Sequence, residues 1–333
     1  MKAIFLCDDN GSNINRIYTQ ELCARLKKTV DIDCDIIISK DNISKYKELA
    51  QLADYAFSTW GMPSFSEEEI KEYFPNLKAV FYGAGSVQGF ARPFLNRCIA
   101  VHSAWAANAV PVAEYTVSQI LLANKGFFQG CLMQSRGEHS TEFYASFPGN
   151  YDCKVGIIGA GMIGKLVIKL LKDYNIEVLV FDPFLNETEA SLLGVKKCSL
   201  EDIFKDCQTI SNHLANNNET KGMLNYDLFS KMKHNATFIN TGRGAQVVEE
   251  HLIKVLCENP SMTAVLDVTD PEPPVKDSPF YSLPNVFLTP HIAGSSGNEV
   301  RRMGQFMIEE LERIVNGEQV KYSVTLEMLK TMA

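Results

Sequence analysis

The segment KVGIIGAGMIGKLVIKLL, residues 154–171, places three glycines between a short apolar run and an amphipathic one. The first run has the length of a buried strand, and the second has the apolar periodicity of a helix. Gly159, Gly161 and Gly164 stand in G-x-G-x-x-G spacing. The first glycine permits a tight turn, the second lets another group approach the backbone, and the third lets the helix pack close to the strand. The segment therefore predicts a strand, a tight turn and a helix, the beginning of a unit that builds parallel sheets.

Short apolar runs alternate with longer amphipathic ones along almost the whole chain of 333 residues. This alternation predicts parallel strands joined by helical crossovers, and therefore an α/β fold. We expect strands at residues 3–7, 34–38, 53–58, 77–82, 154–158, 177–181, 209–212, 236–240, 262–267 and 286–288. We expect helices at residues 15–28, 67–74, 104–126, 162–173, 247–257 and 298–315.

The length corresponds to about two domains of roughly 150 residues each. Two series of predicted strands are separated by the apolar segment 104–126, expected to form a long buried helix, and by the polar stretch 134–152, expected to be an exposed excursion. We place a domain boundary near residue 103. The periodicity alone does not decide which domain the last helix packs on.

Composition excludes several classes of protein. The chain has 40 acidic and 32 basic residues, a formal net charge of −8, which counts against nucleic acid or an anionic membrane as its main partner. No stretch reaches the roughly 18 apolar residues of a membrane span, and the apolar run near the N-terminus is too short for a secretory signal. The nine cysteines are scattered and form no C-x-x-C pair, so we expect no disulfide framework, no metal site and a cytoplasmic location.

A helix N-terminus after such glycines offers free N–H groups and the positive end of a dipole to a pyrophosphate. The next predicted strand ends at Asp182, where a carboxylate can accept hydrogen bonds from ribose hydroxyls. Glycines in a turn can be merely structural, but strand, glycines, helix, strand and acid in this register favour dinucleotide binding. NAD is favoured over NADP, because a carboxylate repels the 2′-phosphate and residues 183–190 contain no Lys or Arg.

Three later strand candidates each end near a polar residue that hydride transfer to or from a 2-oxo acid requires. Arg243, in FINTGRGA, offers a planar fork for a carboxylate, and His291, in VFLTPHIAG, exchanges a proton near neutral pH. Glu272, in LDVTDPEPP, can orient a neighbouring imidazole and favour its protonated form. Taken singly, Arg243 could be a salt-bridge arginine, Glu272 a loop acid and His291 a helix-capping residue. Their joint placement favours a catalytic site.

The sequence resembles the D-isomer-specific 2-hydroxyacid dehydrogenases over nearly its whole length, most specifically in VGIIGAGMIG, FINTGRGA, VLDVTDPEPP and LPNVFLTPHIAG. The resemblance implies an NAD-dependent oxidoreductase that interconverts a small 2-oxo acid and a D-2-hydroxy acid. It implies that Arg243 binds the substrate carboxylate, that His291 is the acid/base, and that Glu272 polarises the histidine. It also implies that backbone N–H groups in YGAGSVQG bind the same carboxylate, at Gly85, Ser86 and Val87.

The same resemblance implies two Rossmann-like or flavodoxin-like domains with parallel sheets. The NAD domain, residues 103–293, is then inserted in a discontinuous substrate domain formed by 1–102 and 294–333, to which the last helix returns. Family members imply a homodimer through the NAD domain, with residues 134–152 near that interface. We predict that NAD is bound by Gly159, Gly161, Met162, Ile163, Gly164, Asp182, Thr241 and Asp267.

Two departures from the family pattern stand out. In NHLANNNETKG the chain has Ala215 and Asn216 where many members have a proline, which bears on cofactor affinity more than on chemistry, and GNYDCK replaces the usual turn before the glycine strand. Formate dehydrogenases, which pair their histidine with glutamine, are disfavoured by Glu272. Two other functions stay open: a non-catalytic NAD(H)-sensing interaction protein, such as a corepressor, and another Rossmann dehydrogenase. No basic cluster indicates a phosphorylated substrate. Trp60 and Met62 are candidates for the residues that select the side chain of the substrate.

Overall fold

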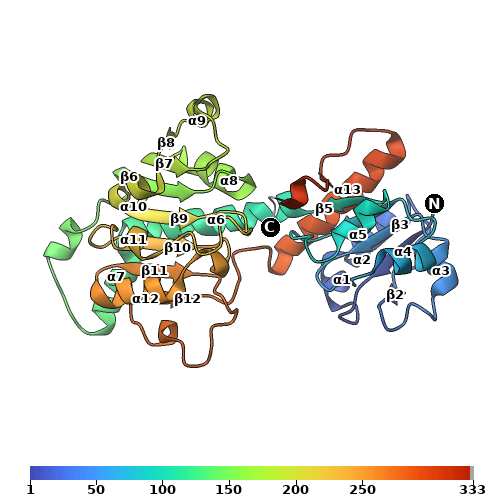
Figure 1. The fold of residues 1–333 in the computed structure, drawn as a ribbon, viewed down its shortest axis with the longest axis horizontal. Helices are drawn as coiled ribbons and strands as arrows, with labels where there is room; N and C mark the ends of the chain where they lie inside the picture. The colour runs from blue at the N-terminus through green and yellow to red at the C-terminus, as the bar shows by residue number, and fades with distance from the viewer. Residues whose placement is uncertain (331–333) are drawn as a thin grey trace. The chain divides into compact units, whose positions relative to one another are not determined.

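The computed structural model describes residues 1–330 and divides into two compact units. Unit 1 comprises Met1–Asn108 and the segment from Ser295 onward, and unit 2 comprises Ala109–Gly294 (Figure 1). The first division falls inside helix α6 (Trp105–Asn124), a few residues after the boundary that the sequence predicts near residue 103. Residues 331–333 of the predicted last segment, 294–333, lie outside the described residues.

Unit 1 is built on a six-stranded sheet in the order β13-β5-β4-β3-β1-β2. Five of its strands are parallel and β13 is antiparallel to β5. The parallel strands therefore follow the flavodoxin-like order 2-1-3-4-5. All residues of β1, β3 and β4 are buried, as expected for strands covered on both faces. The bounds are β1 (Ala3–Leu6), β2 (Ile37–Ile38), β3 (Tyr55–Ser58), β4 (Ala79–Tyr82), β5 (Ala100–Ser103) and β13 (Ser323–Val324).

The last long helix, α13 (Val300–Asn316), packs on α1, α2, β4 and β5 of unit 1. Its Glu310 is fully buried, and the carboxylate accepts hydrogen bonds from the backbone N–H groups of Lys321 and Tyr322. These bonds hold the chain that leads into β13 at the edge of the sheet. The other helices of the unit are α1 (Ser12–Ile17), α2 (Gln20–Leu26), α3 (Lys47–Gln51), α4 (Glu67–Tyr73), α5 (Ala91–Asn96) and the 3-10 turns η4 (Gly297–Glu299) and η5 (Met328–Lys330).

The single helix predicted over residues 15–28 is instead the pair α1 and α2. The first helix ends because Tyr18 leaves the helical conformation, with φ −96° and ψ 76°. Its ring is buried in the core and packs against Phe5 and Phe57 of the sheet. A tertiary aromatic contact thus interrupts an apolar pattern that continues through the break.

Unit 2 is built on a seven-stranded parallel sheet in the order β12-β11-β10-β9-β6-β7-β8. Numbered from the first strand of the unit, this is 3-2-1-4-5-6-7, the doubly wound order of dinucleotide-binding sheets. The predicted α/β class with parallel sheets is therefore confirmed. The strands are β6 (Tyr151–Ile158), β7 (Asn175–Phe181), β8 (Lys196–Lys197), β9 (Thr209–Asn212), β10 (Thr237–Asn240), β11 (Thr263–Leu266) and β12 (Val286–Leu288).

Helices cover both faces of this sheet, and neighbouring residues of a strand point to opposite faces. In β10, for example, Phe238 lies in the cluster formed with α10, α11 and α12, whereas Ile239 lies in the cluster formed with α6, α8 and α9. Among residues 1–330, no helix has both the length and the apolar character needed to cross a membrane. The remaining elements are α7 (Phe127–Ser135), α8 (Met162–Leu171), α9 (Glu187–Leu193), α10 (Leu200–Asp206), α11 (Tyr226–Phe229), α12 (Glu249–Glu258), η1 (Glu142–Ala145), η2 (Gly244–Gln246) and η3 (Pro279–Tyr281).

Candidate active site

The turn between β6 and α8 is too close to its neighbours for side chains at two of its glycines. Gly159 has φ +94°, and a Cβ atom there would lie 2.7 Å from the carbonyl oxygen of His213. A Cβ atom at Gly164 would lie 2.0 Å from the carbonyl oxygen of Gly159. A Cβ atom at Gly161, by contrast, would meet no protein atom within 4 Å. The open side of the turn is therefore at the N-terminus of α8, where a pyrophosphate would be received.

Asp182, at the end of β7, ties this turn to the next loop. Its Oδ2 atom accepts a hydrogen bond from the N–H of Ala160 at 2.7 Å, and Oδ1 accepts from Phe184 and Leu185 at 2.8 and 3.0 Å. A carboxylate has about four acceptor positions, so one remains on Oδ2 for a ribose hydroxyl. These residues fit a dinucleotide. Of the two predicted contacts that follow Gly161, Met162 is 47% exposed and Ile163 is partly buried against the core.

Arg243 follows β10, and its side chain is largely shielded from solvent. Burial lowers the pKa of its guanidinium, and the negative charge of Glu272 acts in the opposite direction. Its Nη1 atom donates a hydrogen bond to the carbonyl oxygen of Gly242 at 2.8 Å. The group stays protonated, because a guanidinium does not lose its proton in proteins. A partly buried cation with spare N–H donors is suited to a carboxylate ligand.

His291 and Glu272 form a direct pair. The Nδ1 atom of His291 lies 2.6 Å from Oε1 of Glu272, and the two side chains are 46% and 40% exposed. Within residues 1–330, the Nε2 atom of His291 has no hydrogen-bond partner. A carboxylate on Nδ1 places the exchangeable proton of the ring at Nε2, so this atom is available for proton transfer.

The loop that presents His291 is held by Asp267, which is only 3% exposed. His291 has φ +55°, a left-handed conformation that is uncommon outside glycine. The carboxylate of Asp267 accepts hydrogen bonds from the Thr289 hydroxyl, at 2.6 Å, and from the N–H groups of Ile292 and Ala293, at 2.8 and 2.9 Å. Strained backbone persists where its surroundings over-determine it, and these bonds do so here.

Two predicted cofactor residues, Thr241 and Asp267, are almost fully buried. The Thr241 hydroxyl contacts Thr116 Oγ1 at 3.3 Å and His213 Nδ1 at 3.5 Å. The role of Asp267 in holding the His291 loop was not foreseen from the sequence. The sequence signal for this role is that Asp267 follows β11 and stands between apolar residues. An acid buried there requires nearby hydrogen-bond donors. Cofactor contact by these two residues stays a prediction.

His213, at the end of β9, is buried behind the glycine turn. Desolvation lowers the pKa of its imidazole to about 3, so the ring is neutral near neutral pH. Its Nε2 atom lies 2.9 Å from the hydroxyl of Ser211. A neutral, buried ring serves packing beneath the cofactor turn rather than proton exchange.

The predicted carboxylate-binding loop, Gly85 to Val87, belongs to unit 1 and follows β4. The hydroxyl of Ser103 donates to the carbonyl oxygens of Ala84 and Gly85, at 2.9 and 2.7 Å. In the described part of the chain, the N–H groups of Gly85, Ser86 and Val87 donate no hydrogen bond. Consecutive free amides of this kind suit an anion. Arg243, Glu272 and His291 all belong to unit 2.

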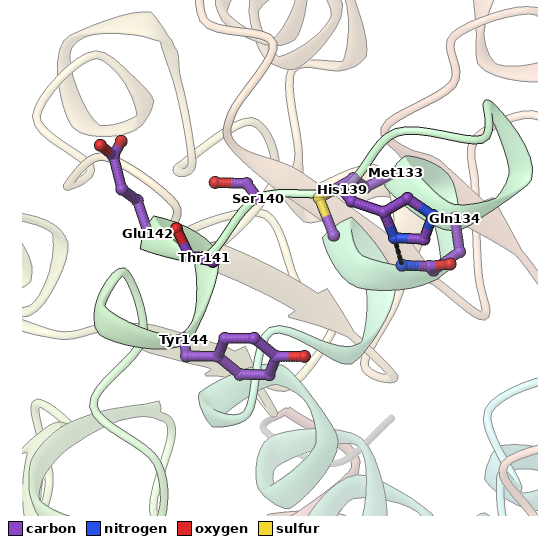
Figure 2. A pocket seen from close by; sticks show the side chains of 7 residues that line it. All are labelled: Met133, Gln134, His139, Ser140, Thr141, Glu142 and Tyr144. Carbon is purple, nitrogen blue, oxygen red and sulfur yellow. Dashed lines mark hydrogen bonds between the residues drawn. The ribbon is translucent and has the colours of Figure 1, made fainter.

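A separate pocket of unit 2 lies in the predicted polar excursion. In Figure 2 its side chains come from the end of α7 and from η1 and the segment before it, and Gln134 Nε2 contacts His139 Nδ1 at 3.2 Å. None of the predicted site residues lines it. The lining residues are Met133, Gln134, His139, Ser140, Thr141, Glu142 and Tyr144.

The sheet order and glycine turn of unit 2 define a dinucleotide-binding protein. Residues 117–293, more than half of the chain, match the family described as D-isomer specific 2-hydroxyacid dehydrogenase, NAD binding domain. The chain belongs to the D-isomer specific 2-hydroxyacid dehydrogenase family, and the matching residues form its NAD-binding domain.

Individual relatives agree with this assignment. The chain is 29% identical to D-3-phosphoglycerate dehydrogenase of Archaeoglobus fulgidus over 234 residues, 70% of this chain and 44% of that protein. It is 27% identical to glyoxylate reductase of Korarchaeum cryptofilum over 268 residues, 79% of this chain and 81% of that protein. The chain spans about half the length of several curated relatives. The match covers 44%, 42% and 56% of the length of three of them.

A solved structure extends the likeness of fold to nearly the entire chain. A phosphoglycerate oxidoreductase from Rhizobium etli superimposes with a TM-score of 0.79 at 23% identity, covering 97% of this chain and 98% of that one. This match confirms the α/β fold.

The glycine turn makes a testable prediction about cofactor binding. Gly161→Ala adds a Cβ that meets no protein atom, so we expect an unchanged melting temperature but an NADH affinity at least about tenfold weaker, because the pyrophosphate can no longer approach. Fluorescence titration with NADH measures this change. Gly164→Ala is the contrasting variant, because its Cβ overlaps backbone, and we expect it to lower the melting temperature. Parental NADH affinity in Gly161→Ala would place the pyrophosphate elsewhere.

Proposed function

We propose that this protein is an NAD-dependent oxidoreductase that interconverts a small 2-oxo acid and a D-2-hydroxy acid. The observation that carries the proposal is the 2.6 Å contact between His291 Nδ1 and Glu272 Oε1, in the same unit as Arg243 and the glycine turn. The similarity to proteins named D-3-phosphoglycerate dehydrogenase and glyoxylate reductase supports this reaction class.

Arg243 is proposed to bind and orient the substrate carboxylate. Its planar guanidinium offers two parallel N–H donors, and shielding from solvent strengthens their interaction with an anion. In unit 1, the N–H groups of Gly85, Ser86 and Val87, which donate no hydrogen bond in the described part of the chain, are proposed to donate to a carboxylate. Both assignments use groups whose hydrogen-bonding capacity the fold leaves unfilled.

His291 is proposed to move the proton. In reduction, its protonated imidazole gives the Nε2 proton to the oxygen on C2 of the substrate, and in oxidation the neutral ring takes that proton back. Glu272 accepts the hydrogen bond from Nδ1, orients the ring and favours its protonated form. NAD, when bound, supplies or accepts the hydride.

Asp182 is proposed to select NAD rather than NADP. Its remaining acceptor position suits a hydroxyl donor, whereas a 2′-phosphate would bring negative charge against the carboxylate. No Lys or Arg lies within residues 183–190 to neutralise such a phosphate.

We further propose a homodimer formed through the NAD-binding domain. Phe127, at the start of α7, and Tyr144, within the segment 134–152, are 46% and 86% exposed and would be covered by a second copy. A cytoplasmic location is proposed because all nine cysteines, each in the described part of the chain, are free.

A substrate screen tests the proposed function. NADH oxidation is followed with glyoxylate, hydroxypyruvate, pyruvate and bulkier branched 2-oxo acids, and we expect at least one to reach a kcat/KM of about 10⁴ M⁻¹ s⁻¹ or more. Where the product is chiral, as from hydroxypyruvate or pyruvate, its D-enantiomer and not its L-enantiomer should be oxidised with NAD. Tight NADH binding with no turnover would instead support a sensor, and dependence on ammonia would support an amino-acid dehydrogenase.

Replacement of the proposed acid/base gives a second test. His291→Ala should lower kcat by about 10² to 10⁴-fold, because the proton on the substrate oxygen loses its donor, while NADH affinity stays at the parental value. Steady-state kinetics and NADH fluorescence measure the two effects. His234→Ala is a suitable control, since His234 is exposed and its Nδ1 atom contacts the hydroxyl of Ser261 at 3.0 Å. Near-parental rates in His291→Ala would remove this residue from the mechanism.

Glu272 is tested through the rate of reduction at a fixed pH. Its Oε1 atom contacts Nδ1 of His291, so it orients the ring that is proposed to deliver the proton. For Glu272→Gln we expect kcat/KM to fall about tenfold, because the neutral amide holds the ring less firmly than the carboxylate does, while NADH affinity stays at the parental value. A parental kcat/KM would show that Glu272 does not act through the histidine.

A further inference from the structure

The side chain of Gln246, in η2, is fully buried and makes four hydrogen bonds. Its Oε1 atom accepts from Nδ2 of Asn212, at 2.5 Å, and from the N–H of Arg243, at 3.2 Å. Its Nε2 atom donates to the carbonyl oxygens of Leu214 and Ala215, at 2.7 and 2.9 Å. A primary amide has two donors and two acceptor positions, so its capacity is filled. In the flipped amide, the NH2 group would face the N–H donors of Asn212 and Arg243, and the oxygen would face the two carbonyl oxygens. The hydrogen bonds therefore fix the orientation of the amide.

Two asparagines extend this network across the ends of β9 and β10. Asn212 Nδ2 also donates to Asn240 Oδ1 at 3.0 Å, and both side chains are buried. Asn240 Nδ2 donates to the carbonyl oxygen of Arg243 at 3.1 Å. The main-chain N–H and C=O of Arg243 are therefore both held by amide side chains. The packing is tight, because a Cβ atom at Gly242 would lie 2.9 Å from Gln246 Oε1 and 3.0 Å from Asn212 Nδ2.

The other end of the network reaches the glycine turn. β9 lies beside β6 at the point where the strand order of the sheet reverses, which is where such sheets bind dinucleotides. A Cβ atom at Gly159 would lie 2.7 Å from the carbonyl oxygen of His213 and 2.9 Å from the nitrogen of Leu214. The loop that Gln246 holds at Leu214 and Ala215 is thus in van der Waals contact with the cofactor turn.

This loop, whose residues 213–216 read HLAN, contains no proline. Proline restrains a loop by fixing one backbone dihedral angle. Here two carbonyl oxygens of the loop are instead fixed by Nε2 of Gln246. The restraint comes from a side chain that also holds the main chain of Arg243.

We propose that Gln246 is a positioning residue that couples the cofactor-binding loop, residues 213–215, to Arg243. A displacement of either partner breaks bonds in the same filled amide, so cofactor binding and carboxylate binding are energetically linked and the linkage is reciprocal. The effect on carboxylate binding through Arg243, the Arg243 half of this inference, rests on the proposed function. The effect on NADH binding through the loop 213–215, the cofactor half, does not.

Two substitutions separate the halves. Gln246→Leu removes all four bonds with a side chain of similar size, and we expect NADH to bind at least fivefold more weakly and KM for the 2-oxo acid to rise at least fivefold. We expect kcat to change less than KM, because Arg243 holds the carboxylate equally in ground and transition states. Gln246→Glu keeps the acceptors for Asn212 and Arg243 but cannot donate to both loop carbonyl oxygens, so NADH affinity should fall, while KM at saturating NADH should rise less than in Gln246→Leu.

Asn285→Leu is the matched control. Asn285 is also buried, and its Nδ2 donates to the carbonyl oxygens of Leu256 and Met262 at 3.1 and 2.9 Å, before β12 at the opposite edge of the strands. Its loss should lower the melting temperature and leave NADH affinity and KM unchanged. A merely structural role for Gln246 would give the same pattern in Gln246→Leu.

The outcomes are distinguishable. Parental NADH affinity in folded Gln246→Leu or in Gln246→Glu overturns the coupling, whatever the substrate. Weakened NADH binding in a protein that turns over no 2-oxo acid contradicts the proposed function and leaves the cofactor half supported. If Gln246→Leu does not fold, the NADH affinity and KM of Gln246→Glu decide the question.

Discussion

Close approach of backbone to backbone at the glycine turn is the constraint on which the rest of unit 2 depends. Gly164 brings α8 against the carbonyl oxygen of Gly159, and Gly159 lies against the loop after β9. This contact holds the turn against the loop after β9, whereas the ladder hydrogen bonds pair β6 with β9, the two strands at which the order of the sheet reverses. The loop after β9 therefore lies against the glycine turn, and the loops after β10, β11 and β12 carry Arg243, Glu272 and His291.

Much of this arrangement was predictable, because strand ends and glycine spacing are local properties. The strands at 209–212 and 286–288 and the positions of Arg243, Glu272 and His291 after strands follow from the sequence pattern. The split between α1 and α2 was not, because it depends on Tyr18 packing against a distant strand. β8 and β13 have two residues each, which is too few to show the alternation of apolar and polar residues that indicates a strand. The amides of Asn212 and Gln246 read as ordinary polar residues until the fold buries them together.

The net charge of the chain is negative, although the ligands proposed for its site are anions. A net charge of −8 repels anionic ligands at long range, where salt also screens it. Attraction therefore has to be local. Under the proposed function it comes from Arg243, whose partial burial lowers the effective dielectric constant around its charge. Binding of this kind selects by shape and donor geometry rather than by overall charge.

The left-handed backbone of His291 places stability and chemistry in competition at one residue. An L-amino acid in this conformation costs about 1–2 kcal/mol relative to an ordinary one, whereas glycine adopts it freely. Drift towards stability would favour glycine at this position, and under the proposed function selection for proton transfer by the histidine opposes it. Members of a lineage that no longer need the reaction can gain stability by losing the histidine. The identity of this single residue is therefore a sensitive record of whether the chemistry is still under selection.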